Sequence, residues 1–143
     1  MDYNGNGKLS SANLYLKHPS PASDTTTTRA LYEYTSPTSG VYLLSGRQIE
    51  KDYDRDQDWT VEGEAEYTYD ASRRLVEAAS VGSGKVVLTY NATTHKITEA
   101  NSYRTDGVNE YLFSTLSYDY ALRKTTVTEQ DDNYIINKFD DYG

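Results

Sequence analysis

The chain has 143 residues, enough for one domain with a modest core. Its formal net charge of −8 disfavours bare nucleic acid and anionic membranes as partners, and the lack of cysteine excludes disulfides, thiolate metal sites and cysteine nucleophiles. No apolar run approaches the roughly 20 residues that span a bilayer, and no signal peptide follows Met1. With 15 Tyr against 2 Phe and 1 Trp, we expect a thin sheet with half-buried rings.

Turn signals divide the chain into short strand segments from the N-terminus onward. Hairpins are predicted at residues 3–9 and, in a degenerate form, at 32–41. Residues 18–28, rich in Pro, Ser and Thr, predict a long irregular connection, and residues 52–58, with four aspartates, predict an exposed, solvated turn. Further hairpins are predicted at 67–75, 90–97 and 118–124, with glycine-containing turns at 81–85 and 103–109.

The hairpin segments share one pattern: a tyrosine, an aspartate or asparagine, a short turn, a basic residue and then an apolar residue. Tyr69-Asp70, followed by Arg74 and Leu75, is an example. The Asp or Asn side chain can bond its own nearby backbone and so start the turn, and the basic and apolar residues restart the next strand. The flanks alternate apolar and polar residues as strands do, and no stretch has helical periodicity.

These features predict one all-β domain over residues 1–143, an antiparallel β-meander of repeated hairpins with about nine or ten strands. The twist of such a sheet is compatible with a half-barrel or open barrel. If the sheet stays open, its edge strands offer a route to a dimer. The residues expected on its buried face are Tyr69, Leu75, Val86, Leu88, Tyr90, Ile97, Leu116 and Tyr118.

The Tyr-Asp hairpins resemble the YD (Tyr-Asp) repeat proteins, and more closely the β-meander surface lipoproteins of Bacteroides-type gut bacteria. Arg73 and His95 stand near where those repeats usually have glycine. The resemblance implies an extracellular, cell-surface or periplasmic setting and a structural or binding role, and it supplies no catalytic residues. We also expect the chain to be a piece of a longer protein, with any signal segment outside this sequence.

A calcium loop is the first candidate site. Asp2, Asn4 and Asn6 place oxygen ligands at alternate positions before Gly7, as calcium loops do, but Asn13 takes the place of the usual bidentate acid. The same segment also fits the hairpin pattern. The two alternatives are therefore a calcium-stabilised module and a plain hairpin turn.

An aromatic platform is the second candidate site. Trp59, with Tyr53 and Tyr67, could stack on the ring faces of a sugar. The alternative is that the rings cover the sheet through cross-strand pairs, which the strand-end position of the repeated tyrosines favours. These three residues are the candidate ligand-binding residues.

No catalytic pattern accompanies the two histidines, His18 and His95, and no phosphate-binding glycine loop precedes a helix. We therefore predict a non-catalytic cell-surface or periplasmic module, structural or binding, with a glycan or a protein as partner and no cofactor except calcium in the alternative above. The second interpretation is a carbohydrate-binding protein that uses exposed Trp and Tyr side chains.

Overall fold

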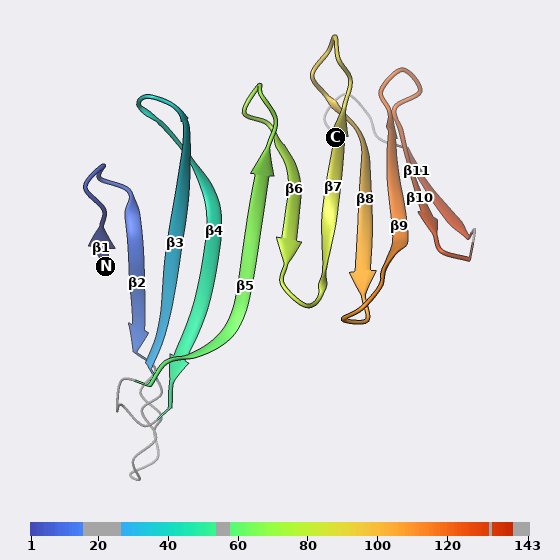
Figure 1. Ribbon diagram of the computed structural model, residues 1–143. Coiled ribbons are helices and arrows are strands. Elements are labelled where there is room, and N and C mark those ends of the chain that lie inside the picture. Colours follow the sequence, from blue (N-terminus) through green and yellow to red (C-terminus); the bar gives the residue numbers. More distant parts are fainter. Residues whose placement is uncertain (16–26, 54–57, 132, 139–143) are drawn as a thin grey trace. The chain divides into compact units, whose positions relative to one another are not determined.

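The computed structural model describes residues 1–15, 27–53, 58–131 and 133–138. Its strands are antiparallel to their neighbours and follow one another in chain order, with no helix in these ranges (Figure 1). The predicted open antiparallel β-meander is confirmed, and no described strand pair closes it. The strands are β1 (Asp2–Tyr3), β2 (Leu9–Tyr15), β3 (Thr27–Thr38), β4 (Val41–Asp52), β5 (Thr60–Tyr69), β6 (Leu75–Ser80), β7 (Gly84–Tyr90), β8 (Ile97–Thr105), β9 (Glu110–Asp119), β10 (Lys124–Glu129) and β11 (Tyr134–Lys138).

Most of the predicted turns are confirmed. The degenerate segment at 32–41 is the β3–β4 hairpin, with Gly40 at a positive φ of 79°. The turn predicted at 103–109 joins β8 to β9, where the Asp106 carboxylate accepts the N–H groups of Val108 and Asn109. Most of the irregular connection predicted at 18–28, and residues 54–57 of the acidic turn, lie outside the described residues.

The chain divides into two compact units, residues 1–67 and 68–143. In the first unit, β3 and β4 are the longest strands and pair from Thr27↔Asp52 to Thr38↔Val41. The register of this pair shifts twice, and that of the β4–β5 pair shifts once, between Ile49 and Glu50. Each shift marks a bulge, where the twist of the sheet increases and the alternation of faces is interrupted.

In the second unit, each face of the sheet has its own chemistry. One face carries a row of apolar residues, each directly opposite the next on the neighbouring strand: Leu88, Ala100, Leu116, Val127 and Ile135. The opposite face is more polar, although Val87 lies on it, and there the Lys85 ammonium lies 2.9 Å from the Glu110 carboxylate and 3.5 Å from that of Glu77. The strands therefore alternate as expected for period-2 patterning.

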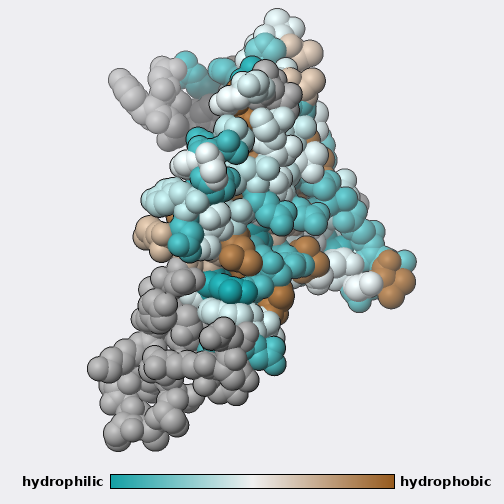
Figure 2. All heavy atoms as spheres, turned by 60° about the vertical axis from the view of Figure 1, so that its left-hand side comes forward, coloured by the Kyte–Doolittle hydropathy of each residue, from teal (hydrophilic) through white to brown (hydrophobic). Residues whose placement is uncertain are grey.

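Within each unit the described strands form one layer, and no described apolar side chain is fully buried. The buried face expected from the sequence is therefore only half-buried, and Val86 is 37 % exposed. The reason is that no described element packs on the sheet, so each side chain is covered only by neighbours on adjacent strands. On the face shown in Figure 2, hydrophobic residues accordingly form separate patches among hydrophilic ones.

Candidate functional site

The four repeat copies fold into the same kind of turn, at the tips of the hairpins β1–β2, β5–β6, β7–β8 and β9–β10. In each, the Asp or Asn after the tyrosine caps the turn with its side-chain oxygen, which accepts backbone N–H groups two to four residues ahead, as predicted. The bonds run from Asn6 and Lys8 to Asn4 (both 3.0 Å), from Arg74 to Asp70 (2.9 Å), from Thr93 and Thr94 to Asn91 (2.9 and 2.7 Å), and from Leu122 to Asp119 (2.9 Å).

One residue of each tip has a left-handed backbone. It is Gly7 in the first copy, at φ 71°, but Arg73, His95 and Arg123 in the other three, at 65°, 58° and 51°. A side chain makes this conformation costly, which is why glycine usually occupies it. Three hairpins of the second unit therefore keep a basic residue or histidine at a position where glycine would be easier.

The basic residue that follows the left-handed position reaches a tyrosine of a later hairpin. The Arg74 guanidinium lies 4.6 Å from the centre of the Tyr90 ring, and the Lys96 ammonium lies 4.7 Å from that of Tyr120. In the first unit, Lys8 makes the equivalent contact with Tyr42 at 5.9 Å. Such cation–π contacts tie successive tips together. These contacts were not predicted from the sequence, because the basic residue was expected only to begin the outgoing strand of its own hairpin.

The β5–β6 tip is the most connected of these turns. The Arg74 guanidinium lies 2.7 and 2.6 Å from the Asp70 carboxylate and 3.1 Å from Nδ1 of His95. The backbone N–H and then the side chain of Arg74 hold the pKa of Asp70 below its ordinary value, because both stabilise the charged form. The Tyr90 hydroxyl donates to the carbonyl of Leu75 at 2.7 Å and joins this tip to β7.

Trp59 and Tyr53, two of the predicted ligand-binding residues, each contact a basic side chain. The Arg29 guanidinium covers the Trp59 ring at 3.9 Å and also pairs with Glu50, whose side chain is buried. One face of the indole is therefore occupied by a cation of the protein itself. Because a sugar would need a free ring face, only the other face of Trp59 remains for the predicted stacking.

Tyr53 belongs to a small polar cluster. Its hydroxyl donates to the Glu62 carboxylate at 2.6 Å, and Lys51 lies 3.5 Å from the same carboxylate. The hydrogen bond raises the pKa of Tyr53 and lowers that of Glu62, since it stabilises the neutral phenol and the charged carboxylate. Tyr67 is half-buried on β5, and no described contact joins it to Tyr53 or Trp59. The three residues stay a predicted site.

Asp2, Asn4 and Asn6 lie in the β1–β2 hairpin, with Asp2 on β1 and the asparagines in the turn. The Asp2 carboxylate accepts a hydrogen bond from Ser11, and the side-chain oxygen of Asn4 is engaged by two backbone N–H groups. Hairpin bonds thus account for two of the three proposed calcium ligands. In the part of the chain that the structure describes, no three His, Cys, Asp or Glu side chains are grouped to hold a metal. Calcium binding here stays a prediction.

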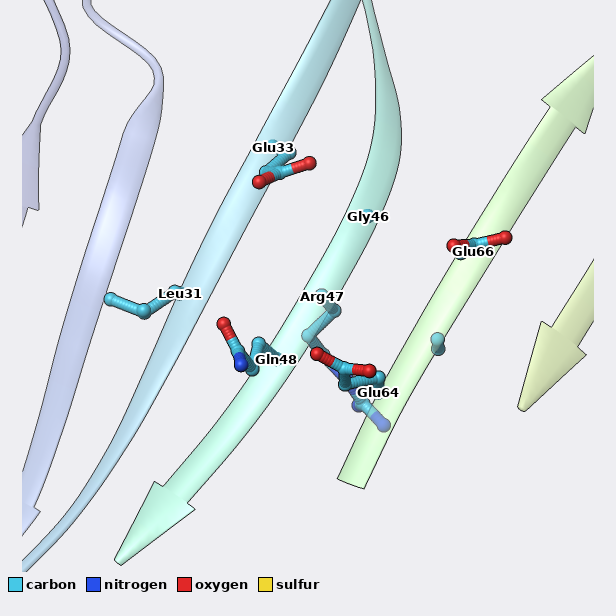
Figure 3. A pocket seen from close by; sticks show the side chains of 8 residues that line it. Leu31, Glu33, Gly46, Arg47, Gln48, Glu64 and Glu66 are labelled. Carbon is cyan, nitrogen blue, oxygen red and sulfur yellow. The ribbon is translucent and has the colours of Figure 1, made fainter. Parts of the chain in front are cut away.

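A shallow hollow lies on the first unit above Gly46 of β4 (Figure 3). Glu33 of β3 and Glu66 of β5 flank it, directly opposite Gly46 in register, and Glu64 lies on the same face. Its volume is about 140 Å³, whereas small-molecule sites usually have roughly 300–1,000 Å³. It has neither a nucleophile next to a base nor an enclosed wall, so it is too small and too open for the catalytic arrangements that a cleft provides.

Comparison with known proteins places this chain in no established group: no family model, curated protein or solved structure matches it. The described residues contain no helix long and apolar enough to cross a membrane.

Proposed function

We propose that this chain is a non-catalytic structural and binding module that presents both faces and the hairpin tips of a one-layer sheet to its surroundings. The observation that carries the proposal is that no described apolar side chain is fully buried, and that some, such as Ile135 and Ile136 of β11, are exposed. A sheet of this kind has much accessible surface for its mass. Its contacts with a partner would be made along strands and tips, since the hollows lined by its described residues are open to solvent.

Contacts within the sheet supply the rigidity that a second layer would otherwise supply. They are the capped turns, the cation–π contacts between tips, and cross-strand ion pairs such as that of Lys85 with Glu110. These interactions are individually modest, but they recur along the chain. A scaffold held in this way can keep its shape while both faces remain wet, as a spacer or display module requires.

A cell-surface or periplasmic setting is part of the proposal. It is supported by the Tyr-Asp hairpin pattern, and the net charge of −8 is compatible with it. An acidic surface favours solubility and disfavours non-specific binding to anionic membranes.

The test is a binding screen with a chemical readout. The immobilised full chain is exposed to an array of bacterial and host glycans and to an extract of bacterial surface proteins, and every retained ligand is eluted and weighed by mass spectrometry. We expect retained ligands of unchanged mass. A ligand that is shortened or modified in proportion to incubation time would refute the non-catalytic assignment.

A further inference from the structure

The second unit carries three hairpin tips at one end of its strands: β5–β6, β7–β8 and β9–β10 (Figure 1). Each tip places two cationic or imidazole side chains next to one another in sequence. The first of each pair occupies the left-handed backbone position, and the second begins or precedes the outgoing strand. The pairs are Arg73-Arg74, His95-Lys96 and Arg123-Lys124.

Backbone conformation indicates that these side chains are kept for a reason other than folding. The first unit uses glycine at its comparable positive-φ positions, Gly7 and Gly40, where open space surrounds the Cα atom. The second unit instead accepts strain at three successive tips, where Arg73, His95 and Arg123 are all exposed. Strain that recurs at equivalent positions is a pointer to function.

Charge is also separated along the strands of this unit. At the tips, the Asp70 carboxylate is paired with Arg74, and that of Asp119 accepts the N–H of Leu122. Lys124 and Lys138 are direct cross-strand partners at the same end, an arrangement of like charges that is unfavourable by itself. The opposite end of the strands carries the acidic residues Asp106, Glu110, Glu129 and Asp131, with Lys85 and Arg104 as the cations among them.

The tips are linked to one another before any ligand arrives. Arg74 of the first tip contacts both Tyr90 and His95 of the second, and Lys96 of the second contacts Tyr120 of the third. A stacked tyrosine orients a lysine without neutralising its charge. Each tip therefore presents an exposed cation, on Arg73, Lys96 and Arg123, and little ordering remains to be done on binding.

From these observations we infer that the row of tips at Arg73, His95 and Arg123 is a docking edge for a linear acidic polysaccharide, one that carries carboxylate or sulfate groups. The inference deepens the proposed binding function and rests on it. Neighbouring strands lie about 4.8 Å apart. Because successive tips are two strands apart, they are roughly 10 Å from one another. This interval suits a polymer with one acidic group per disaccharide.

A nucleic acid fits the same edge less well. Its phosphates follow one another at about 3.4 Å along each strand of a duplex, so only a minority could meet a tip. The remaining phosphates would face a protein whose net charge is −8. A sparsely charged polymer avoids most of this repulsion.

The experiment compares the full chain with the variant Arg73→Gly/His95→Gly/Arg123→Gly, using hyaluronate and unsulfated chondroitin, each with one carboxylate per disaccharide, as probes and neutral dextran as the uncharged control. We expect the wild type to bind both acidic polymers, with added salt weakening binding, and not to bind dextran. The glycine variant should lose roughly tenfold or more in affinity. Its melting temperature should nevertheless rise by a few degrees, because glycine relieves the left-handed strain.

Two control variants separate the row from overall charge. Arg73→Lys/Arg123→Lys keeps both charge and backbone strain, and should bind as the wild type does. Arg47→Gln/Arg104→Gln removes two exposed cations elsewhere, and should lower affinity far less than the glycine variant. Equal losses in the glycine and Arg47/Arg104 variants would overturn the docking edge, as would unchanged binding in the glycine variant.

Two further outcomes would overturn the inference. If the wild type binds neither acidic polymer, the docking edge is wrong, whereas the module proposed above is tested separately by the glycan and protein screen. If a single-stranded DNA oligonucleotide competes as well as hyaluronate at equal charge concentration, the edge does not select the spacing of the acidic groups and the assignment to polysaccharide is wrong.

Discussion

Removing the Tyr90 hydroxyl tests whether contacts within one layer hold this sheet together. The hydroxyl donates to the Leu75 carbonyl at 2.7 Å, across the β6–β7 hairpin. Tyr90→Phe leaves the ring and its Arg74 contact in place but removes this bond. A neutral hydrogen bond of this kind contributes about 1 kcal/mol to the free energy of unfolding, so we expect a destabilisation of that size.

A second substitution at the same site adds the ring contact. Tyr90→Leu also removes the cation–π contact with Arg74, at 4.6 Å, which adds about 0.5–1 kcal/mol at an accessible site. The series should therefore run wild type, Tyr90→Phe, Tyr90→Leu in order of decreasing stability. Urea denaturation followed by far-UV circular dichroism measures the free energy of unfolding for each variant.

Tyr103→Phe is the matched control, because Tyr103 is also half-buried and also lies under a basic side chain, Lys85 at 5.5 Å, but its hydroxyl makes no described hydrogen bond. Its free energy of unfolding should stay within about 0.5 kcal/mol of the wild type. If Tyr90→Phe were no less stable than Tyr103→Phe, the hydroxyl bond would not contribute, and the account of a sheet tied by its own side chains would be wrong.

Three further predictions concern backbone space, turn capping and pH. Gly84→Ala should destabilise the fold by about 2 kcal/mol or more, because the added Cβ would lie 2.1 Å from the Tyr103 carbonyl oxygen at a φ of 141°. Thermal melting measures this loss. Gly63 has open space around it, so Gly63→Ala should cost far less. Asn91→Ala should cost about 1 kcal/mol by freeing two turn N–H groups, and hydrogen exchange at Thr93 and Thr94 should accelerate; unchanged exchange would contradict the cap. Because the pKa of Asp70 is lowered in the folded protein, its stabilising effect is fully present above the ordinary carboxyl pKa and is lost as the pH falls through the lower native pKa. When the free energy of unfolding is measured against pH in acid, Asp70→Asn should flatten that part of the curve. An unchanged curve would refute the pairing of Asp70 with Arg74.

Local pattern was enough to predict the turns. Asn91 caps its turn through N–H groups only two and three residues away, and the left-handed residue of each tip follows its capping residue after three or four positions. Such bonds close within one short segment, so the residues that make them are neighbours in the sequence. The alternation in β5, with Ala65 and Tyr67 more covered than Glu64 and Glu66, is visible in the sequence for the same reason.

The candidate sites were less predictable because their geometry depends on partners far away in sequence. Trp59 can be recognised in the sequence as a candidate sugar-stacking residue, but nothing near it in the chain indicates that Arg29 covers its ring. Likewise, the acidic hollow at Gly46 joins residues of three strands, and it exists because their register aligns Glu33 and Glu66 with a residue that lacks a side chain. The predicted sites at Trp59 and at Asp2 stay predictions.

The all-β class, the antiparallel meander and the chemistry of each hairpin tip can be predicted from local sequence, since these follow from period-2 patterning and from turn bonds that span a few residues. The burial of each side chain and the tyrosine that each basic residue meets become apparent only in the folded sheet. Burial depends on whether a second layer covers the sheet, and the contact of Lys8 with Tyr42 depends on the register of several strands and their bulges. Both depend on residues that are far apart in the sequence, so neither can be read from a single segment of the chain.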